Sequence, residues 1–219
     1  MIKAHNISKK FRTRHSRVDA LKNVSLQIDK GDFVSITGPS GSGKSTLLLT
    51  LGGMSAPHEG QVIWKDESVY DWGLRKRAEW RAKTVGFMFQ TFNLIPYLSV
   101  FENVAIAERL SGKQAVDTDK IVGILERMKL GDRLEHLPRE LSVGQQQRVA
   151  MARALVKDPQ LILADEPTGN LDPKAAAGIL DILREINNEG KTVVLITHDP
   201  HTAGIAKRNI RIEDGQVCQ

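Results

Sequence analysis

Hydrophobic runs along the chain are of two kinds, and each kind predicts a different sort of β-strand. FVSIT (33–37), LILA (161–164) and TVVLIT (192–197) are almost continuously apolar, which is typical of strands buried on both faces of a parallel sheet. Runs near the N-terminus alternate with polar residues and carry turn sequences such as DKGD (29–32), which indicates antiparallel, half-exposed strands. The predicted strands are 2–7, 24–28, 33–37, 61–64, 85–90, 161–164, 192–197 and 209–213.

Segments with helical spacing of apolar positions alternate with these strands over much of the chain. The predicted helices are 44–51, 100–110, 119–128, 143–156, 174–188 and 200–205. The long helix over 174–188 is followed by Glu189 and Gly190, and glycine is common just after a helix end. Residues 91–157 contain no strand pattern, so we expect an α/β fold that is interrupted by a helical block.

The composition fits a globular chain without an N-terminal signal or a membrane-spanning helix. The 219 residues are 41% hydrophobic and 26% charged, and no apolar run reaches the roughly 18–20 residues that a spanning helix needs. The net charge of +5 invites a nucleic-acid partner, but no block of Lys and Arg is present, so we expect none. The single cysteine, Cys218, excludes an intrachain disulfide and fits a reducing compartment, which predicts a cytoplasmic protein.

Residues 38–45, GPSGSGKS, match the phosphate-binding pattern G-x-x-x-x-G-K-[ST] and lie between a predicted buried strand and a predicted helix. The glycines let consecutive backbone N–H groups turn toward one point, where the helix N-terminus adds partial positive charge. We expect Lys44 to reach the β- and γ-phosphates, Ser45 to bind Mg²⁺ and Thr46 to hold the α-phosphate side. The predicted nucleotide-binding residues of this loop are Gly38, Pro39, Ser40, Gly41, Ser42, Gly43, Lys44, Ser45 and Thr46.

Polar residues also end or follow three other predicted strands, at the sheet edge where open α/β folds bind ligands. LILADE (161–166) ends in Asp165, expected in the Mg²⁺ shell, and in Glu166, expected to polarise the attacking water as general base. We expect His198 to contact the γ-phosphate and position Glu166, and Gln90 to bind Mg²⁺ or water through its amide oxygen. The predicted catalytic residues are Glu166, His198 and Gln90, and the predicted metal ligands are Ser45, Gln90 and Asp165.

Together these motifs resemble the ATP-binding subunit of ABC transporters over essentially the whole chain. The resemblance is carried, in order, by GPSGSGKS (38–45), Gln90, LSVGQ (141–145), LILADEP (161–167), NLD (170–172) and ITH (196–198). DEPTGNLD (165–172) looks most like the lipoprotein-releasing, macrolide-export and cell-division branch. The resemblance implies an ATPase with one α/β domain of the P-loop NTPase class. Its RecA-like core and antiparallel β subdomain would take residues 1–90 and 158–219, and an inserted α-helical subdomain would take 91–157.

The resemblance also implies that Phe11, in KKF (9–11), stacks on the adenine of ATP. Family members often carry tyrosine there, and phenylalanine keeps the ring face while it loses the hydroxyl. A buried aromatic residue in the protein core is the competing interpretation of Phe11.

LSVGQQQRVAMARAL (141–155) begins a predicted helix with Ser142 at the N-cap, which leaves backbone N–H groups able to bind an anion. This second phosphate-type helix start could face the chain's own nucleotide or that of another chain. The resemblance implies the latter: a homodimer forms head to tail on ATP binding, and Ser142, Gly144 and Gln145 cover the other copy's γ-phosphate, with residues 170–172 at the interface. Val143 replaces the family's usual glycine, and we expect this to be tolerated because the backbone N–H remains.

An integral membrane permease is the further partner that the resemblance implies, docked between Gln90 and Asn103. The stretch TFNLIPYLSVFENV (91–104) is apolar and aromatic there, and part of it can be subdomain core. The chain would then lie in the cytoplasm, peripheral on the inner face of the cell membrane. The basic stretch LRKRAEWRAK (74–83) could touch lipid, RNA or a partner, but its charges lie on more than one helical face, which favours a solvated helix.

Two function classes fit the sequence equally well. One is the ATPase of an export or lipoprotein-release transporter, and the other is an ABC-type ATPase that drives a non-transport membrane process, such as cell-division or signalling regulation. Soluble ABC proteins of translation or DNA repair resemble two cassettes in one chain or carry a long coiled-coil insertion, and these 219 residues show neither. A small-molecule kinase would leave LSVGQ without a role.

Overall fold

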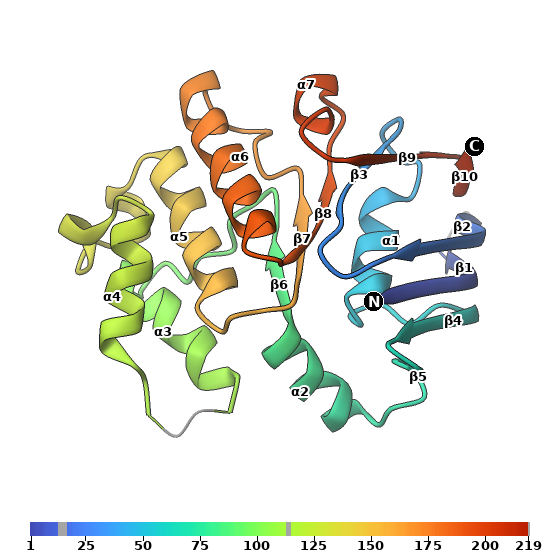
Figure 1. The fold of residues 1–219 in the computed structure, drawn as a ribbon, viewed down its shortest axis with the longest axis horizontal. Helices are drawn as coiled ribbons and strands as arrows, with labels where there is room; N and C mark the ends of the chain where they lie inside the picture. The colour runs from blue at the N-terminus through green and yellow to red at the C-terminus, as the bar shows by residue number, and fades with distance from the viewer. Residues whose placement is uncertain (13–16, 113–114, 219) are drawn as a thin grey trace.

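Two β-sheets form the frame of the fold in the computed structural model, which describes residues 1–12, 17–112 and 115–218 (Figure 1). The smaller sheet is antiparallel, with the order β2-β1-β4-β5. Its strands are β1 (Ile2–Arg12), β2 (Arg17–Ile28), β4 (Glu59–Trp64) and β5 (Glu67–Ser68). The larger sheet has the order β10-β9-β3-β8-β7-β6. Its strands are β3 (Phe33–Thr37), β6 (Val85–Met88), β7 (Leu161–Asp165), β8 (Thr192–Ile196), β9 (Arg208–Glu213) and β10 (Gln216–Cys218).

Helices cover the larger sheet and build a separate cluster at one end of the molecule (Figure 1). They are α1 (Lys44–Leu51), α2 (Leu74–Thr84), α3 (Val100–Leu110), α4 (Thr118–Arg127), α5 (Val143–Leu155), α6 (Pro173–Asn188) and α7 (Pro200–Ala203), with short 3₁₀ turns at Gly131–Arg133 and Pro138–Glu140. The cluster consists of α3, α4 and α5, all of which come between β6 and β7 in the chain. No helix of the described residues combines the length and the apolar character needed to cross a bilayer.

Alternate residues of the central strands enter two different hydrophobic cores, because successive side chains of a strand point to opposite faces. Leu161 and Leu163 of β7 pack in a core with α1 and the smaller sheet. Ile162 and Ala164 of the same strand pack in a second core with residues of α3, α4, α5 and α6. Burial on both faces is the reason that these strands are continuously apolar in sequence.

The predicted α/β fold with an antiparallel N-terminal sheet is confirmed, but several strand ends were placed wrongly. The strand predicted at 85–90 ends at Met88, so Gln90 lies in the loop beyond it. β1 runs past residue 7 to Arg12, because register shifts between Ala4 and Lys10 break the alternation on which the prediction rested.

The sequence analysis missed two strands, β10 and β5, and the structure shows the conformation of the basic stretch 74–83. Asp214 and Gly215 have φ of +47° and +79° and form the two-residue turn between β9 and β10, a hairpin that the Asp-Gly pair signals. The two-residue strand β5 is too short to leave a periodic pattern. The stretch 74–83 forms α2, and Trp80 is its buried residue, which agrees with a largely solvated helix.

Four neighbouring parallel strands, β3, β8, β7 and β6, point the same way. Their carboxyl ends therefore meet at one edge of the sheet, at the top in Figure 1. The polar residues that the sequence places at or after these strand ends are brought together there.

Candidate functional site

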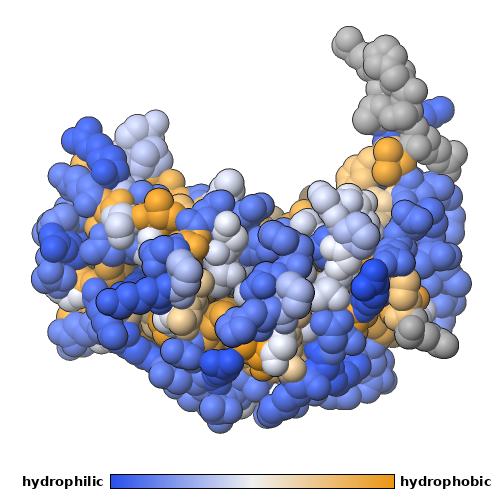
Figure 2. All heavy atoms as spheres, turned by 90° about the horizontal axis from the view of Figure 1, so that it is seen from above, coloured by the Kyte–Doolittle hydropathy of each residue, from blue (hydrophilic) through white to orange (hydrophobic). Residues whose placement is uncertain are grey.

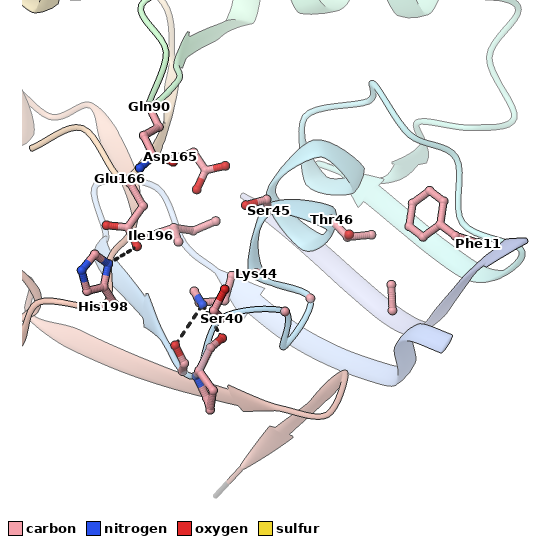
Figure 3. A pocket seen from close by; sticks show the side chains of 15 residues that line it. Phe11, Ser40, Lys44, Ser45, Thr46, Gln90, Asp165, Glu166, Ile196 and His198 are labelled. Carbon is pink, nitrogen blue, oxygen red and sulfur yellow. Dashed lines mark hydrogen bonds and ion pairs between the residues drawn. The ribbon is translucent and has the colours of Figure 1, made fainter. Parts of the chain in front are cut away.

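A cleft of about 750 Å³ opens at this edge of the sheet (Figure 3). Figure 2 views the molecule from above and shows hydrophilic residues predominating on this side. Most of the predicted site lines the cleft, namely Phe11, Gly38, Pro39, Ser40, Gly41, Gly43, Lys44, Ser45, Thr46, Gln90, Asp165, Glu166 and His198. Ala20 and Ile196, which the sequence did not single out, complete the lining. The predicted Ser42 is buried in the loop and does not line the cleft.

Gly38 and Gly43 give the phosphate-type loop a shape that other residues would not adopt. Their φ angles are +146° and +101°, in the region that favours glycine. A Cβ atom on Gly38 would lie 1.9 Å from the carbonyl oxygen of Ile212, and one on Gly43 would lie 2.2 Å from that of Ala20. Gly43 is also the N-cap of α1, and no side chain caps this helix start, so its N–H groups are available to an anion.

The Lys44 ammonium lies folded against this loop. Its Nζ atom donates hydrogen bonds to the carbonyl oxygens of Gly38, at 2.9 Å, and Pro39, at 2.7 Å. Only 9% of the residue is exposed, so these carbonyls fix where the positive charge sits. An ammonium has three protons, and the third can donate to a phosphate oxygen in the cleft without either bond being broken.

Asp165 and Ser45 lie close together in the cleft and provide oxygen atoms suited to a hard cation (Figure 3). Burial raises the pKa of Asp165 above its ordinary value, and the hydroxyl of Ser45, which hydrogen-bonds to it, opposes that rise. A divalent cation would offset the same desolvation cost, because its charge favours the ionised carboxylate. Within the described residues, no group of three or more His, Cys, Asp and Glu side chains could hold a metal ion alone. The oxygens present therefore fit Mg²⁺ that completes its shell with phosphate and water.

Glu166 and His198 form a contact pair beside this cluster. The His198 Nδ1 atom lies 2.8 Å from Glu166 Oε1, and the glutamate side chain is 14% exposed while the histidine side chain is 72% exposed. Glu166 has φ of +47°, an uncommon conformation for a residue with a side chain. This backbone turn sends Glu166 and Asp165 in different directions from adjacent positions (Figure 3).

The loop after β6 brings Gln90 to the same cleft although the strand ends earlier. Its backbone carbonyl accepts a hydrogen bond from Asn170 Nδ2 at 3.3 Å. Gln90 is thus linked to the segment after Glu166, which contains the predicted interface residues 170–172.

Phe11 lines the cleft at the end remote from Glu166 and is 45% exposed. The interpretation of Phe11 as a core residue is therefore wrong. Lys9 Nζ lies 5.6 Å from the centre of its ring. An exposed aromatic ring in the cleft suits stacking with a flat heterocycle.

Ser142, Gly144 and Gln145 do not line the cleft. The start of α5 is a capping box, in which Ser142 Oγ accepts from the Gln145 N–H at 3.3 Å and Gln145 Oε1 accepts from the Ser142 N–H at 2.9 Å. A Cβ atom on Gly144 would meet the Cβ of Ala175 in α6 at 3.1 Å, so this glycine lets the two helices approach. Val143 is 46% exposed, and Ser142 before it is exposed as well.

Gln147 is a residue that the sequence analysis missed. It is 1% exposed, and its Nε2 atom donates to the carbonyl oxygen of Pro167 at 2.6 Å, directly after Glu166. The bond joins the helix α5 to the segment that carries the glutamate. Three consecutive glutamines, 145–147, follow Gly144, and only Gln147 is buried. Because successive residues of a helix point to different sides, the sequence could have indicated that only one of the three faces the core.

The glycine loop, the lysine inside it and the carboxylates at the end of a neighbouring parallel strand define a P-loop nucleoside triphosphatase. A family model described as ABC transporter matches residues 21–169. Among solved structures, the dimeric MJ0796, a bacterial ABC transporter cassette, is 42% identical with a TM-score of 0.94, and the alignment covers 100% of this chain and 97% of that one. The same cassette in a post-hydrolysis state, bound to ADP and Pi, is 40% identical with the same TM-score and coverage.

Curated relatives fall into two groups by length. The lipoprotein-releasing system ATP-binding protein LolD of Myxococcus xanthus is 42% identical over 221 residues, which cover 100% of this chain and 99% of that protein. The macrolide export ATP-binding/permease protein MacB of Bdellovibrio bacteriovorus is also 42% identical, but the match covers 99% of this chain and 33% of that protein. This chain thus spans a third of the length of that MacB relative. The chain belongs to the ABC transporter family and is an ATP-binding cassette with ATPase activity.

We predict that replacing Gln147 with methionine lowers ATP turnover by about threefold to tenfold, as expected for the loss of one hydrogen bond of ~1 kcal/mol that positions Glu166. Methionine has a similar length and no donor, so packing is kept. Steady-state kinetics should show a lower kcat with little change in ATP affinity, and the melting temperature should stay close to that of the wild type. The exposed Gln160→Met is the matched control; equal kinetics in both variants would remove the positioning role.

Proposed function

We propose that this chain is the ATP-hydrolysing subunit of an export or lipoprotein-release transporter and that it works as a pair of copies around two ATP molecules. The observation that carries the pairing is the place of the α5 start, outside the chain's own cleft and accessible to solvent. Within the described chain no hydrogen bond reaches the backbone N–H of Val143 or Gly144. A second copy placed head to tail would set these groups against the γ-phosphate. The dimeric MJ0796 cassette supports this arrangement, and the LolD and MacB relatives support the transport branch.

In this proposal the loop 38–45 wraps the β- and γ-phosphates with backbone N–H groups, and Lys44 adds its third proton. Thr46 lies on the α-phosphate side, and Phe11 stacks on the adenine. The approach of the triphosphate into a pocket already shaped by Gly38 and Gly43 needs little backbone rearrangement, which keeps the ordering cost of binding low.

Ser45, Asp165 and Gln90 would hold Mg²⁺, with Asp165 bound through water. The ion supplies charge neutralisation at the β- and γ-phosphate oxygens when it is bound. The chain's own contribution is to hold the three oxygen donors on different elements, α1, β7 and the loop after β6, so that they converge at one point.

Glu166 orients the attacking water and accepts its proton, and His198 holds Glu166 in place through the 2.8 Å contact. The His198 side chain is 72% exposed and lines the same cleft, so it would contact the γ-phosphate there. Loss of the γ-phosphate would remove both its contacts and those of the other copy's Ser142, Gly144 and Gln145, so hydrolysis weakens the pair. Asn170 to Asp172 would lie across the interface between the copies.

The motion of the pair would pass to an integral membrane permease docked between Gln90 and Asn103. Of the large apolar and aromatic residues in that stretch, Tyr97 is 85% exposed, while Leu94 and Phe101 pack against the core. We place the chain on the cytoplasmic side, peripheral to the inner face of the membrane. It would act as one ABC domain over 1–219, with 91–157 as its α-helical subdomain.

Lys44→Ala should abolish ATP binding, because it removes the charge that the loop carbonyls hold at the phosphate position. Binding of a fluorescent ATP analogue measures this directly, and Lys22→Ala, an exposed lysine outside the cleft, is the control. Wild-type affinity in the Lys44 variant would contradict the assignment of the loop.

Glu166→Gln should bind ATP but hydrolyse it at least about a hundredfold more slowly, in the range typical for a general base. The trapped ATP state should elute as a dimer on size-exclusion chromatography, and removal of ATP should return it to monomer. A variant that stays monomeric at saturating ATP would count against the paired site.

Val143→Gly should leave the ATPase rate within about twofold of the wild type, because the N–H donor is unchanged and the valine side chain is exposed. The measurement is a steady-state ATPase assay of both proteins at equal concentration. Hydrolysis that is seen only in the glycine variant would mean that valine blocks the incoming phosphate.

A further inference from the structure

The turn between β9 and β10 lies against the phosphate-type loop, although the two are far apart in sequence. The backbone N–H of Gly215 donates a hydrogen bond to the carbonyl oxygen of Ser42 at 3.1 Å. β9 approaches the loop as well, because a Cβ atom on Gly38 would lie 1.9 Å from the carbonyl oxygen of Ile212. The β9–β10 hairpin therefore contacts the loop in two places, once at its start and once shortly before the helix α1.

The strand β2 holds the same turn from another side. The N–H of Lys22 donates to the carbonyl oxygen of Gly215 at 2.8 Å, so the two backbone polar groups of Gly215 are bonded to different elements. The carbonyl oxygen of Ala20, also in β2, would lie 3.0 Å from a Cβ atom on Gly215 and 2.2 Å from one on Gly43. β10 lies beside β2 (Figure 1). The turn, the loop and β2 are thus in mutual contact through their backbones.

Position 215 requires glycine for two separate reasons. Its φ of +79° lies in the region that favours glycine, and a side chain would press on the Ala20 carbonyl oxygen. Asp214 before it has φ of +47°, so both central residues of this two-residue hairpin turn have positive φ. Gly215 is buried, whereas Asp214 is exposed. A side chain at 215 would therefore displace the turn relative to β2 and the loop.

The hydrogen bond from Gly215 fixes the direction of one peptide group of the loop. The carbonyl of Ser42 and the N–H of Gly43 belong to the same planar trans peptide unit, in which they point in opposite directions. Because the hairpin holds the carbonyl oxygen, the N–H of Gly43 is turned away from the hairpin, and Gly43 lines the nucleotide cleft. Within the described part of the chain, no group accepts a hydrogen bond from this N–H.

We propose that Gly215 is a positioning residue for phosphate binding: it holds the Ser42 carbonyl so that the loop presents the Gly43 N–H to the triphosphate. The proposal rests on the role proposed above for the loop 38–45, and it assigns part of the shape of that loop to the β9–β10 hairpin. Without the bond from the hairpin, the peptide unit can rotate and turn the negative end of its carbonyl toward the phosphates. A loop that binds anions through its N–H groups would then bind them more weakly.

The experiment compares Gly215→Ala with Gly190→Ala in the full chain. Gly190 is the matched control: its φ is +90°, it is exposed just after α6, and a Cβ atom there would meet nothing within 4 Å. Both variants place alanine at positive φ, but only position 215 contacts the loop. We expect Gly215→Ala to weaken ATP binding about fivefold or more, as for the loss of one hydrogen bond, and Gly190→Ala to stay within about twofold of the wild type.

Turnover separates positioning of the loop from general loosening of the fold. Glu166 and His198 follow β7 and β8, away from the hairpin, and their contact at 2.8 Å does not involve it. In Gly215→Ala the KM for ATP should therefore rise while kcat at saturating ATP stays within about twofold of the wild type. Melting temperatures of both glycine variants show whether their stabilities have fallen equally.

A second pair of variants disturbs the turn without adding an atom against the Ala20 carbonyl. Asp214→Val places a β-branched residue at positive φ, which valine disfavours, whereas Asp214→Asn places a residue that tolerates it. The valine variant should weaken ATP binding in the same direction as Gly215→Ala, and the asparagine variant should bind ATP like the wild type. Because Asp214 is exposed, this pair decides the question if Gly215→Ala does not fold.

Inorganic tripolyphosphate, used as a competitor of a fluorescent ATP analogue, tests the loop alone. It has no base to stack on Phe11, so its binding depends on the phosphate end of the cleft. We expect Gly215→Ala to weaken tripolyphosphate and ATP by the same factor. Phe11→Ala is the opposite control, since it should weaken ATP and leave tripolyphosphate unchanged.

The outcomes distinguish this proposal from the proposed function. Equal ATP affinities in folded Gly215→Ala and Gly190→Ala would overturn the positioning role, and so would a loss of ATP affinity that tripolyphosphate does not share. If Gly215→Ala does not fold, equal ATP affinities in the two Asp214 variants would overturn it. A wild-type protein that binds neither ligand, or a Lys44→Ala variant that binds both normally, would instead refute the role proposed for the loop, whatever the glycine variants do.

Discussion

The parallel pairing of β3, β8, β7 and β6 is the constraint on which the rest of the molecule depends. Side-by-side parallel strands end at the same edge, so four polar loops from distant parts of the chain must converge there. That convergence is what places the Lys44 ammonium, the Asp165 and Glu166 carboxylates and the Gln90 amide around one cleft. The hydrophobic cores on both faces keep the sheet rigid, because each strand is held by alternate side chains packed above and below it.

The helix α5 connects this cleft with the surfaces where partners are proposed to bind. Its start packs through Gly144 on Ala175, its middle reaches Pro167 through Gln147, and its end holds residues 92 and 93 through Arg153. A rigid element that touches the catalytic segment, the loop after β6 and the helix α6 can transmit a displacement at one of them to the others. In the proposed function, the same element serves the nucleotide of another copy and the permease that docks on its own copy.

The sequence predicted the fold and the cleft well because both depend on local patterns. Apolar runs identify the buried strands, and the loop 38–45 has a fixed spacing that requires its own backbone shape. The sequence analysis missed three irregular features. They are the bulged extension of β1, the end of β6 before Gln90, and the burial of the Gln147 side chain. Each of these depends on which residues face one another across the fold, and three glutamines in a row look alike until α5 is packed against Pro167.

The exposed, self-capped start of α5 has a kinetic consequence. If each cleft is completed by another copy, the complete site exists in proportion to the square of the protein concentration at low concentration, rather than in direct proportion to it. Stray copies in the cytoplasm would then consume almost no ATP. A membrane subunit that holds two copies together would raise their effective concentration and remove this dependence. ATP would then be hydrolysed mainly by copies that are bound to the membrane subunit.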